Sequence, residues 1–141
     1  MADAPIRVMV VDDETPARRR LRELLDDCSA SLPIAVVGEA ANGREALDLM
    51  QLAPPDLVLT DINMPDMDGL ELIMALRHAT PRPRIIAISG GYLLSESLFL
   101  PLAQRLGVQR ALAKPFRAEA LLQAVDAVLA APAPPTVAAA T

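Results

Sequence analysis

The chain has 141 residues, enough for one domain with a hydrophobic core of its own. Hydrophobic residues make up 52% of the chain and aromatic residues only 2%, which argues against extensive disorder and against nucleic-acid binding by base stacking. A net charge of −5 and an isoelectric point near 4.8 also argue against DNA binding through the overall electrostatic field.

Single cysteine and histidine residues exclude several kinds of site. Cys28 alone cannot form an intramolecular disulfide, and His78 alone cannot build a metal site of several histidines. The N-terminus lacks the apolar core of a signal peptide, and no apolar run approaches the roughly 20 residues of a membrane helix. We therefore expect a cytoplasmic protein without membrane contact.

Five short apolar runs recur along the chain, and a stretch with helical character follows each. They cover residues 6–11, 34–37, 57–60, 85–88 and 109–113. Most are apolar at consecutive positions, which is typical of strands buried on both faces of a parallel sheet. The last run is rich in alanine and is the weakest strand by propensity. The alternation predicts an α/β fold with a parallel sheet covered by helices on both faces.

The first two helices have recognisable start signals. Thr15 followed by Pro16 predicts an N-cap and the first helical residue. Asn42 with Glu45 three positions later predicts a capping box at the start of the second helix.

The remaining helices are predicted from apolar spacing. The third carries Leu70, Ile73, Met74 and Arg77, and the fourth falls within residues 95–106, where Pro101 is tolerated only in the first turn. The last has one apolar stripe, made of Ala118, Leu121, Leu122, Val125, Val128 and Leu129. Residues 131–141 are mostly Ala and Pro, so we expect a disordered tail after a domain spanning residues 1–130.

Polar residues with related chemistry follow the predicted strands. Ligands of open parallel sheets bind at the carboxyl ends of the strands. Those ends carry Asp12 and Asp13, Asp61, Ser89 and Lys114. Clustered carboxylates need a compensating cation, and Mg²⁺ prefers oxygen ligands of this kind. A carboxylate can also hold a phosphoryl group as an acyl phosphate, so the pattern predicts Mg²⁺-dependent phosphoryl chemistry.

Four motifs together resemble one family. They are Val-Val-Asp-Asp-Glu at 10–14, Leu-Thr-Asp-Ile-Asn-Met-Pro-Asp-Met-Asp-Gly at 59–69, Ile-Ser-Gly at 88–90 and Lys-Pro-Phe at 114–116. In this order they resemble the response-regulator receiver domain of bacterial two-component signalling, over about residues 6–130. The resemblance implies a CheY-like, flavodoxin-like doubly wound fold, with a five-stranded parallel sheet in the order 2-1-3-4-5 and five helices.

The resemblance also implies a magnesium site. Mg²⁺ would be bound by the side chains of Asp13 and Asp61, by the backbone carbonyl of Asn63, and through water by Asp12. Asp61 would be the phosphoacceptor, taking its phosphoryl group from the phosphohistidine of a partner kinase.

Two further residues have implied roles beside the phosphoacceptor. Lys114 would contact the phosphoryl group, and Ser89 would be the switch hydroxyl. The bond between Lys114 and Pro115 matches the family's cis peptide. Ala111 departs from the pattern, because receivers usually carry Tyr or Phe there, and Tyr92 and Phe99 are candidate replacements.

The implied function is that of a signalling domain and not of an enzyme. Its partners would be a sensor histidine kinase or phosphotransfer protein and a downstream protein, without direct contact to nucleic acid. Because no output domain is present, we expect a stand-alone regulator. Four arginines, at positions 18, 19, 20 and 22, form either a solvated helix face or part of a kinase-docking helix.

Three alternatives stay open at this point. A phosphatase of the haloacid-dehalogenase type would use the same nucleophile and Mg²⁺, but it needs an acid where this chain has Asn63. A flavodoxin-like mononucleotide binder would need a phosphate loop in place of Asp12 and Asp13. The chain could also be the receiver part of a DNA-binding response regulator. The Ser89 segment could be a flexible turn and not a switch.

Overall fold

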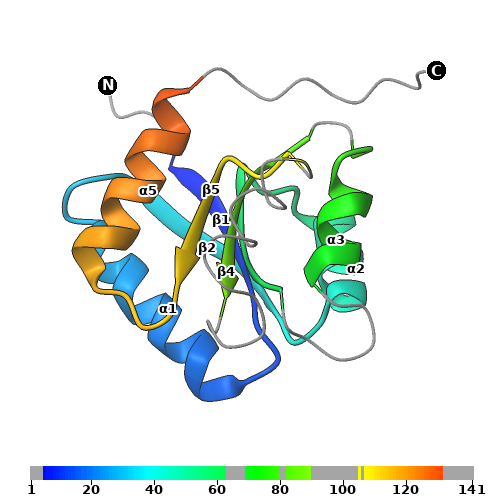
Figure 1. The fold of residues 1–141 in the computed structure, drawn as a ribbon, viewed down its shortest axis with the longest axis horizontal. Helices are drawn as coiled ribbons and strands as arrows, with labels where there is room; N and C mark the ends of the chain where they lie inside the picture. Colours follow the sequence, from blue (N-terminus) through cyan, green and yellow to red (C-terminus); the bar gives the residue numbers. More distant parts are fainter. Residues whose placement is uncertain (1–4, 63–68, 80–81, 90–104, 106, 132–141) are drawn as a thin grey trace.

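A computed structural model describes residues 5–62, 69–79, 82–89, 105 and 107–131 (Figure 1). Five parallel strands form one sheet in the order β2-β1-β3-β4-β5, so the predicted fold and strand order are confirmed. The elements are β1 (Ile6–Val11), α1 (Thr15–Cys28), β2 (Ile34–Ala40), α2 (Gly43–Leu52), β3 (Leu57–Asp61), α3 (Gly69–Leu76), β4 (Arg84–Ser89), β5 (Arg110–Ala113) and α5 (Ala118–Ala130). The predicted fourth helix lies almost entirely outside the described residues, and so does the chain beyond residue 131.

The sheet separates two layers of helices. Figure 1 shows α1 and α5 on one side of it and α2 and α3 on the other. Alternate residues of β1 face the two layers: Val8 and Val10 pack with α1 and α5, whereas Met9 and Val11 pack with α2 and α3. This two-sided burial explains why the strands read as continuous apolar runs.

The third helix differs from its prediction in the face that it buries. Leu72, Ile73 and Leu76 face the core, whereas the side chain of Met74 is 54% exposed. Arg77 follows the end of α3. The short apolar segment fits more than one helical phase, and packing against the sheet selects one of them.

The first helix begins one residue away from its predicted start. Glu14 is the N-cap of α1 and makes no side-chain capping bond, while Pro16 lies in the first turn as predicted. Thr15 is inside the helix, where its hydroxyl oxygen accepts a hydrogen bond from Arg18. The Thr15 hydroxyl thus accepts from a side chain and not, as the predicted N-cap would, from a backbone N–H.

The carboxyl ends of the strands place polar residues along one edge. β1 ends just before Asp12, β3 ends on Asp61, and β5 ends just before Lys114. β2 continues beyond its predicted end to Ala40, whose carbonyl accepts the backbone N–H of Asp12 at 3.0 Å. No helix in the described part of the chain is long and apolar enough to cross a membrane.

Candidate functional site

Three carboxylates meet at the carboxyl edge of the sheet. One oxygen from each of Asp12, Asp13 and Asp61 lies within 4.8 Å of the other two. Asp12 is fully buried and Asp61 is 5% exposed, whereas Asp13 is open to solvent. The parallel topology makes this meeting possible, because β1 and β3 are neighbours and end at the same edge.

The ammonium group of Lys114 bridges two of these carboxylates. Its Nζ lies 3.1 Å from Oδ2 of Asp12 and 3.1 Å from Oδ2 of Asp61. Burial acts to lower the pKa of Lys114, but the hydrogen bonds and charges of Asp61 and Asp12 outweigh it, and the pKa is raised. The amine therefore stays charged at neutral pH. The peptide bond between Lys114 and Pro115 is cis, as expected.

Asp12 is held by hydrogen bonds at every polar group. Its Oδ1 accepts the backbone N–H of Glu14 at 2.9 Å, and its carbonyl accepts Nη1 of Arg18 at 2.7 Å. Its N–H donates to Ala40, and its Oδ2 accepts from Lys114. The run of arginines predicted a solvated or docking face for Arg18 and not this contact, because nothing in the local pattern distinguishes Arg18 from its arginine neighbours.

Gly69 packs directly against the backbone that carries Asp61. A Cβ atom at position 69 would lie 2.2 Å from the carbonyl oxygen of Asp61 and 2.2 Å from Cα of Ile62. Contacts that short do not occur, so only glycine fits at the start of α3. The motif that ends on this glycine contained the signal, but the sequence alone gave no reason for it.

The remaining predicted site residues are described only in part. Ser89 is the last residue of β4 and pairs in register with Ala113, but its side chain is outside the described part of the structure. Asn63, Tyr92 and Phe99 lie outside the described residues. Ala111 lies in β5 and packs, partly buried, against the core on the side of α2 and α3.

The donor set suits a hard divalent cation. Mg²⁺ takes oxygen ligands and is typically held by one or two carboxylates together with phosphate oxygens. The converging oxygens of Asp12, Asp13 and Asp61 provide such a set, and the exposed Asp13 leaves it open to solvent. The residues present therefore fit Mg²⁺.

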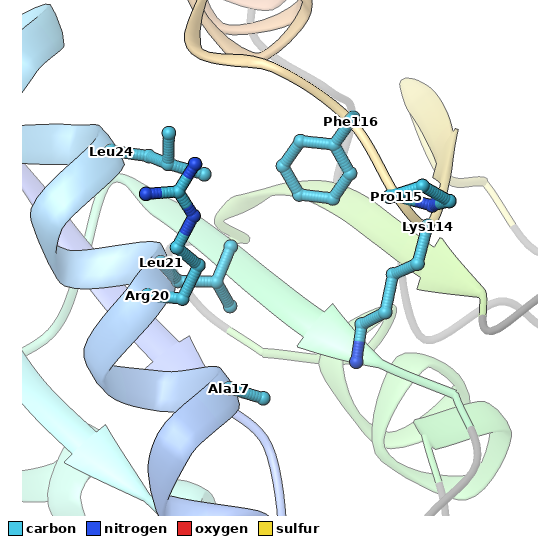
Figure 2. Close-up of a pocket in the computed structure, with 7 residues that line it drawn as sticks. All are labelled: Ala17, Arg20, Leu21, Leu24, Lys114, Pro115 and Phe116. Carbon is cyan, nitrogen blue, oxygen red and sulfur yellow. The ribbon is translucent and has the colours of Figure 1, made fainter.

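A pocket opens beside Lys114, between α1 and the segment that follows β5 (Figure 2). It has a volume of about 280 Å³ and lies between α1 on one side and Lys114, Pro115 and Phe116 on the other. Leu21 and Leu24 make it largely apolar, and Arg20 adds a positive charge. Lys114 connects this pocket to the carboxylates of Asp12 and Asp61.

Comparison with known proteins identifies what the chain is similar to. The family model described as the response regulator receiver domain matches residues 8–126. Protein CcdB of Bacillus subtilis is 32% identical over 123 residues, which cover 87% of this chain and 97% of that protein. A protein-glutamate methylesterase/protein-glutamine glutaminase of Nocardioides sp. is 46% identical over 84 residues, 60% of this chain.

The structural similarity is equally extensive. A chain of the CheX–CheY–BeF₃–Mg²⁺ complex from Borrelia burgdorferi superimposes with a TM-score of 0.77 at 26% identity, covering 89% of this chain and 90% of that one. Several curated relatives are much longer: this chain spans only 22% of the Nocardioides methylesterase.

Proposed function

The chain belongs to the response regulator receiver domain family of two-component signalling, and from that premise we propose that Asp61 accepts a phosphoryl group. The donor is the phosphohistidine of a histidine kinase or phosphotransfer protein, the partners with which receiver domains interact. One observation carries the proposal: Lys114 holds its ammonium group 3.1 Å from the Asp61 carboxylate, inside a cluster of three acids.

The transfer needs a nucleophile and a means of neutralising charge. A carboxylate oxygen of Asp61 attacks phosphorus, the new P–O bond forms as the P–N bond to the donor histidine breaks, and the electron pair leaves on the imidazole nitrogen. The charged Lys114 offsets the negative charge on the phosphoryl oxygens. Ser89 is proposed as the switch hydroxyl that hydrogen-bonds to one of them.

Magnesium belongs to the same proposal. The side chains of Asp13 and Asp61 and the backbone carbonyl of Asn63 would hold it, with Asp12 acting through water. Bound there, it supplies positive charge to the phosphoryl oxygens. The similar Borrelia complex contains Mg²⁺ together with BeF₃, which supports an acidic cluster that takes both a cation and a phosphoryl-like group.

The pocket beside Lys114 is the proposed approach of the phosphodonor. It lies between α1 and the residues that follow β5, and Lys114, which lines it, also contacts Asp12 and Asp61. Leu21 and Leu24 are buried and form only its floor, whereas Arg20 is exposed and favours an acidic residue on the partner.

The phosphoryl charge on Asp61 would act on the segment between Ser89 and Ala111 and so on a downstream protein. We propose a cytoplasmic signalling domain over residues 1–130 that turns over no other substrate and touches neither nucleic acid nor membrane. The family match favours this function over the haloacid-dehalogenase and flavodoxin alternatives.

The decisive experiment is phosphorylation by a small donor. Wild-type protein incubated with MgCl₂ and acetyl phosphate is expected to gain one phosphoryl group by intact mass, and Asp61→Asn none, because an amide cannot form the acyl phosphate. Asp48→Asn, an exposed change on α2, is the matched control and keeps the gain. An unmodified wild type, or an Asp61→Asn protein that gains mass as wild type does, would refute the proposal.

A further inference from the structure

The side chain of Arg18 reaches back from the first turn of α1 to the acidic loop, residues 12–14, that joins β1 to α1. Its Nη1 donates to the carbonyl of Asp12 at 2.7 Å, and its Nη2 donates to the hydroxyl of Thr15 at 3.1 Å. Its Nε lies 3.8 Å from Oε1 of Glu39. The Arg18 side chain is only 17% exposed, which is low for an arginine on a surface helix. The guanidinium is thus held from three directions.

Glu39 holds this arginine from the neighbouring strand. It lies in β2 immediately before Ala40, the residue whose carbonyl accepts the N–H of Asp12. Glu39 also pairs with Arg22, one turn further along α1. The end of β2 therefore fixes the backbone of Asp12 on both sides, directly through Ala40 and indirectly through Arg18.

The Asp12 carbonyl belongs to the peptide unit that joins Asp12 to Asp13. The orientation of this unit sets the direction in which the Asp13 side chain leaves the backbone. Asp13 is exposed, so side-chain packing does little to hold its carboxylate near Asp61. The position of the Asp13 carboxylate in the cluster therefore depends on the backbone to which Arg18 donates its hydrogen bond. Residues that support metal ligands in this way commonly change metal affinity when they are replaced.

We infer that Arg18 is a positioning residue for the acidic cluster: it fixes the peptide between Asp12 and Asp13 so that the Asp13 carboxylate stays beside Asp61, and Glu39 keeps Arg18 in place. The inference rests on the proposed function, because it concerns the Mg²⁺ site of that same cluster. The rigid fork of arginine is needed, since a lysine ammonium cannot span Asp12, Thr15 and Glu39 together.

The direction in which Mg²⁺ affinity changes when Arg18 is replaced separates positioning from simple electrostatics. If charge is all that matters, removing a positive charge near an acidic cluster strengthens cation binding. If Arg18 positions Asp13, its removal weakens cation binding. Arg18→Gln is therefore expected to weaken Mg²⁺ binding about 10-fold, the scale of change seen for residues that support metal ligands. Arg19→Gln is the matched control, because it removes the same charge from an exposed neighbouring position.

The test is a titration of each variant with MgCl₂. Calorimetry measures the Mg²⁺ affinity, and the ¹H–¹⁵N shifts of the Asp13 and Glu14 amides report binding at the acidic cluster. Arg18→Lys, which retains the charge, is expected to bind Mg²⁺ with an affinity between those of wild type and Arg18→Gln. Glu39→Gln should also weaken binding, but loss of its negative charge alone would do the same. The informative comparison is therefore the double variant, in which Glu39→Gln should add little to the effect of Arg18→Gln if the two residues act as one unit. Urea unfolding of each variant checks that the chain is folded under the titration conditions.

Equal or tighter Mg²⁺ binding by Arg18→Gln than by Arg19→Gln would overturn the inference while the proposed function stands. Weaker Mg²⁺ binding by an Arg18→Gln protein that urea unfolding shows to be partly unfolded in the titration would assign Arg18 a structural role only, and would also overturn the inference. A wild-type protein that binds no Mg²⁺ and gains no phosphoryl group from acetyl phosphate would overturn the proposed function and the inference with it.

Discussion

Gly69 has no side chain to offer chemistry, yet the strand that carries Asp61 depends on it. Because a Cβ atom would lie 2.2 Å from the Asp61 carbonyl oxygen, Gly69→Ala must push α3 away from β3. We expect this change to lower the free energy of unfolding by about 1–3 kcal/mol, the usual cost of overpacking. Urea unfolding followed by far-UV circular dichroism measures it, since the chain has no tryptophan.

Gly38 provides the matched control in β2. A Cβ atom there would lie 3.4 Å from Cε of Met9, the end of a flexible side chain. Replacing a strand glycine by alanine also removes an entropic cost of about 0.5–1 kcal/mol. Gly38→Ala should therefore leave stability nearly unchanged or raise it, and a loss as large as that of Gly69→Ala would contradict this account.

The ion pair of Asp56 with Arg7, at the opposite edge of the sheet, should make the stability of the protein depend on pH. Burial acts to raise the pKa of the Asp56 carboxyl, but hydrogen bonds from the Arg7 side chain and backbone, with the charges of Arg7 and Arg84, lower it below its ordinary value. A lowered pKa stabilises the folded state above the ordinary pKa of about 3.9, and this contribution is lost as pH falls through the lower, folded value.

Asp56→Asn should therefore destabilise the protein at pH 7 and have less effect at acid pH below the folded pKa. The pH-dependent part is expected to be at most about 1 kcal/mol, because the Arg7–Asp56 pair is partly exposed. Urea unfolding of wild type and Asp56→Asn across the acid range measures the difference, with the exposed Asp48→Asn as control. A difference that stays constant over that range would contradict the linkage.

At the scale of elements, α2 shows a helix start that its sequence encodes. The Asn42 side chain accepts the backbone N–H of Glu45 at 2.9 Å, which confirms the predicted cap. The Glu45 carboxylate reaches back to the N–H of Ala41, not to that of Asn42 itself, so the capping box closes one residue earlier than in its usual form.

Loss of this cap has a predictable cost. Asn42→Ala removes the acceptor and is expected to lower the free energy of unfolding by about 0.5–2 kcal/mol. Asn42→Ser keeps an acceptor without placing a carboxylate beside that of Glu45, so it should stay close to wild type. The midpoint of urea unfolding compares the three proteins, and equal midpoints for Asn42→Ala and wild type would show that the cap contributes nothing to stability.

For the whole molecule, repulsion between the carboxylates of the candidate site should lower the stability of the fold, and a bound cation would offset that repulsion. Lys114 contacts Asp12 and Asp61, and Asp13 adds a third negative charge within 4.8 Å. Asp13→Asn is therefore expected to stabilise the metal-free protein by about 0.5 kcal/mol, a typical value for charges near a surface. Functional sites often carry such unfavourable clusters.

With Mg²⁺ present, the wild-type protein should become more stable than Asp13→Asn. At ten times its dissociation constant, Mg²⁺ should stabilise the wild-type protein by about 1.4 kcal/mol, and Asp13→Asn should gain less because it lacks a proposed ligand. Thermal unfolding with and without MgCl₂, with CaCl₂ as a comparison, measures both effects. A melting temperature of wild type that MgCl₂ does not move would contradict this prediction.

Much of the architecture could be predicted from the sequence because it depends on local patterns. The apolar runs predicted all five strands, and the alternation with helices predicted a parallel sheet. Predicted boundaries were less accurate at Thr15 and at the end of β2, where tertiary hydrogen bonds extend or displace an element. The burial of α3 was misassigned at Met74, because a short apolar helix has several possible phases.

The sequence by itself determined which residue types stand at the carboxyl ends of the strands, since strand and loop patterns are local. Only the tertiary structure decided the distances between Asp12, Asp13, Asp61 and Lys114, because those depend on strand order and on the path of the loops. It also decided that position 69 must be glycine and that Arg18 donates a hydrogen bond to the Asp12 carbonyl. Both depend on contacts that leave no periodic signal in the chain.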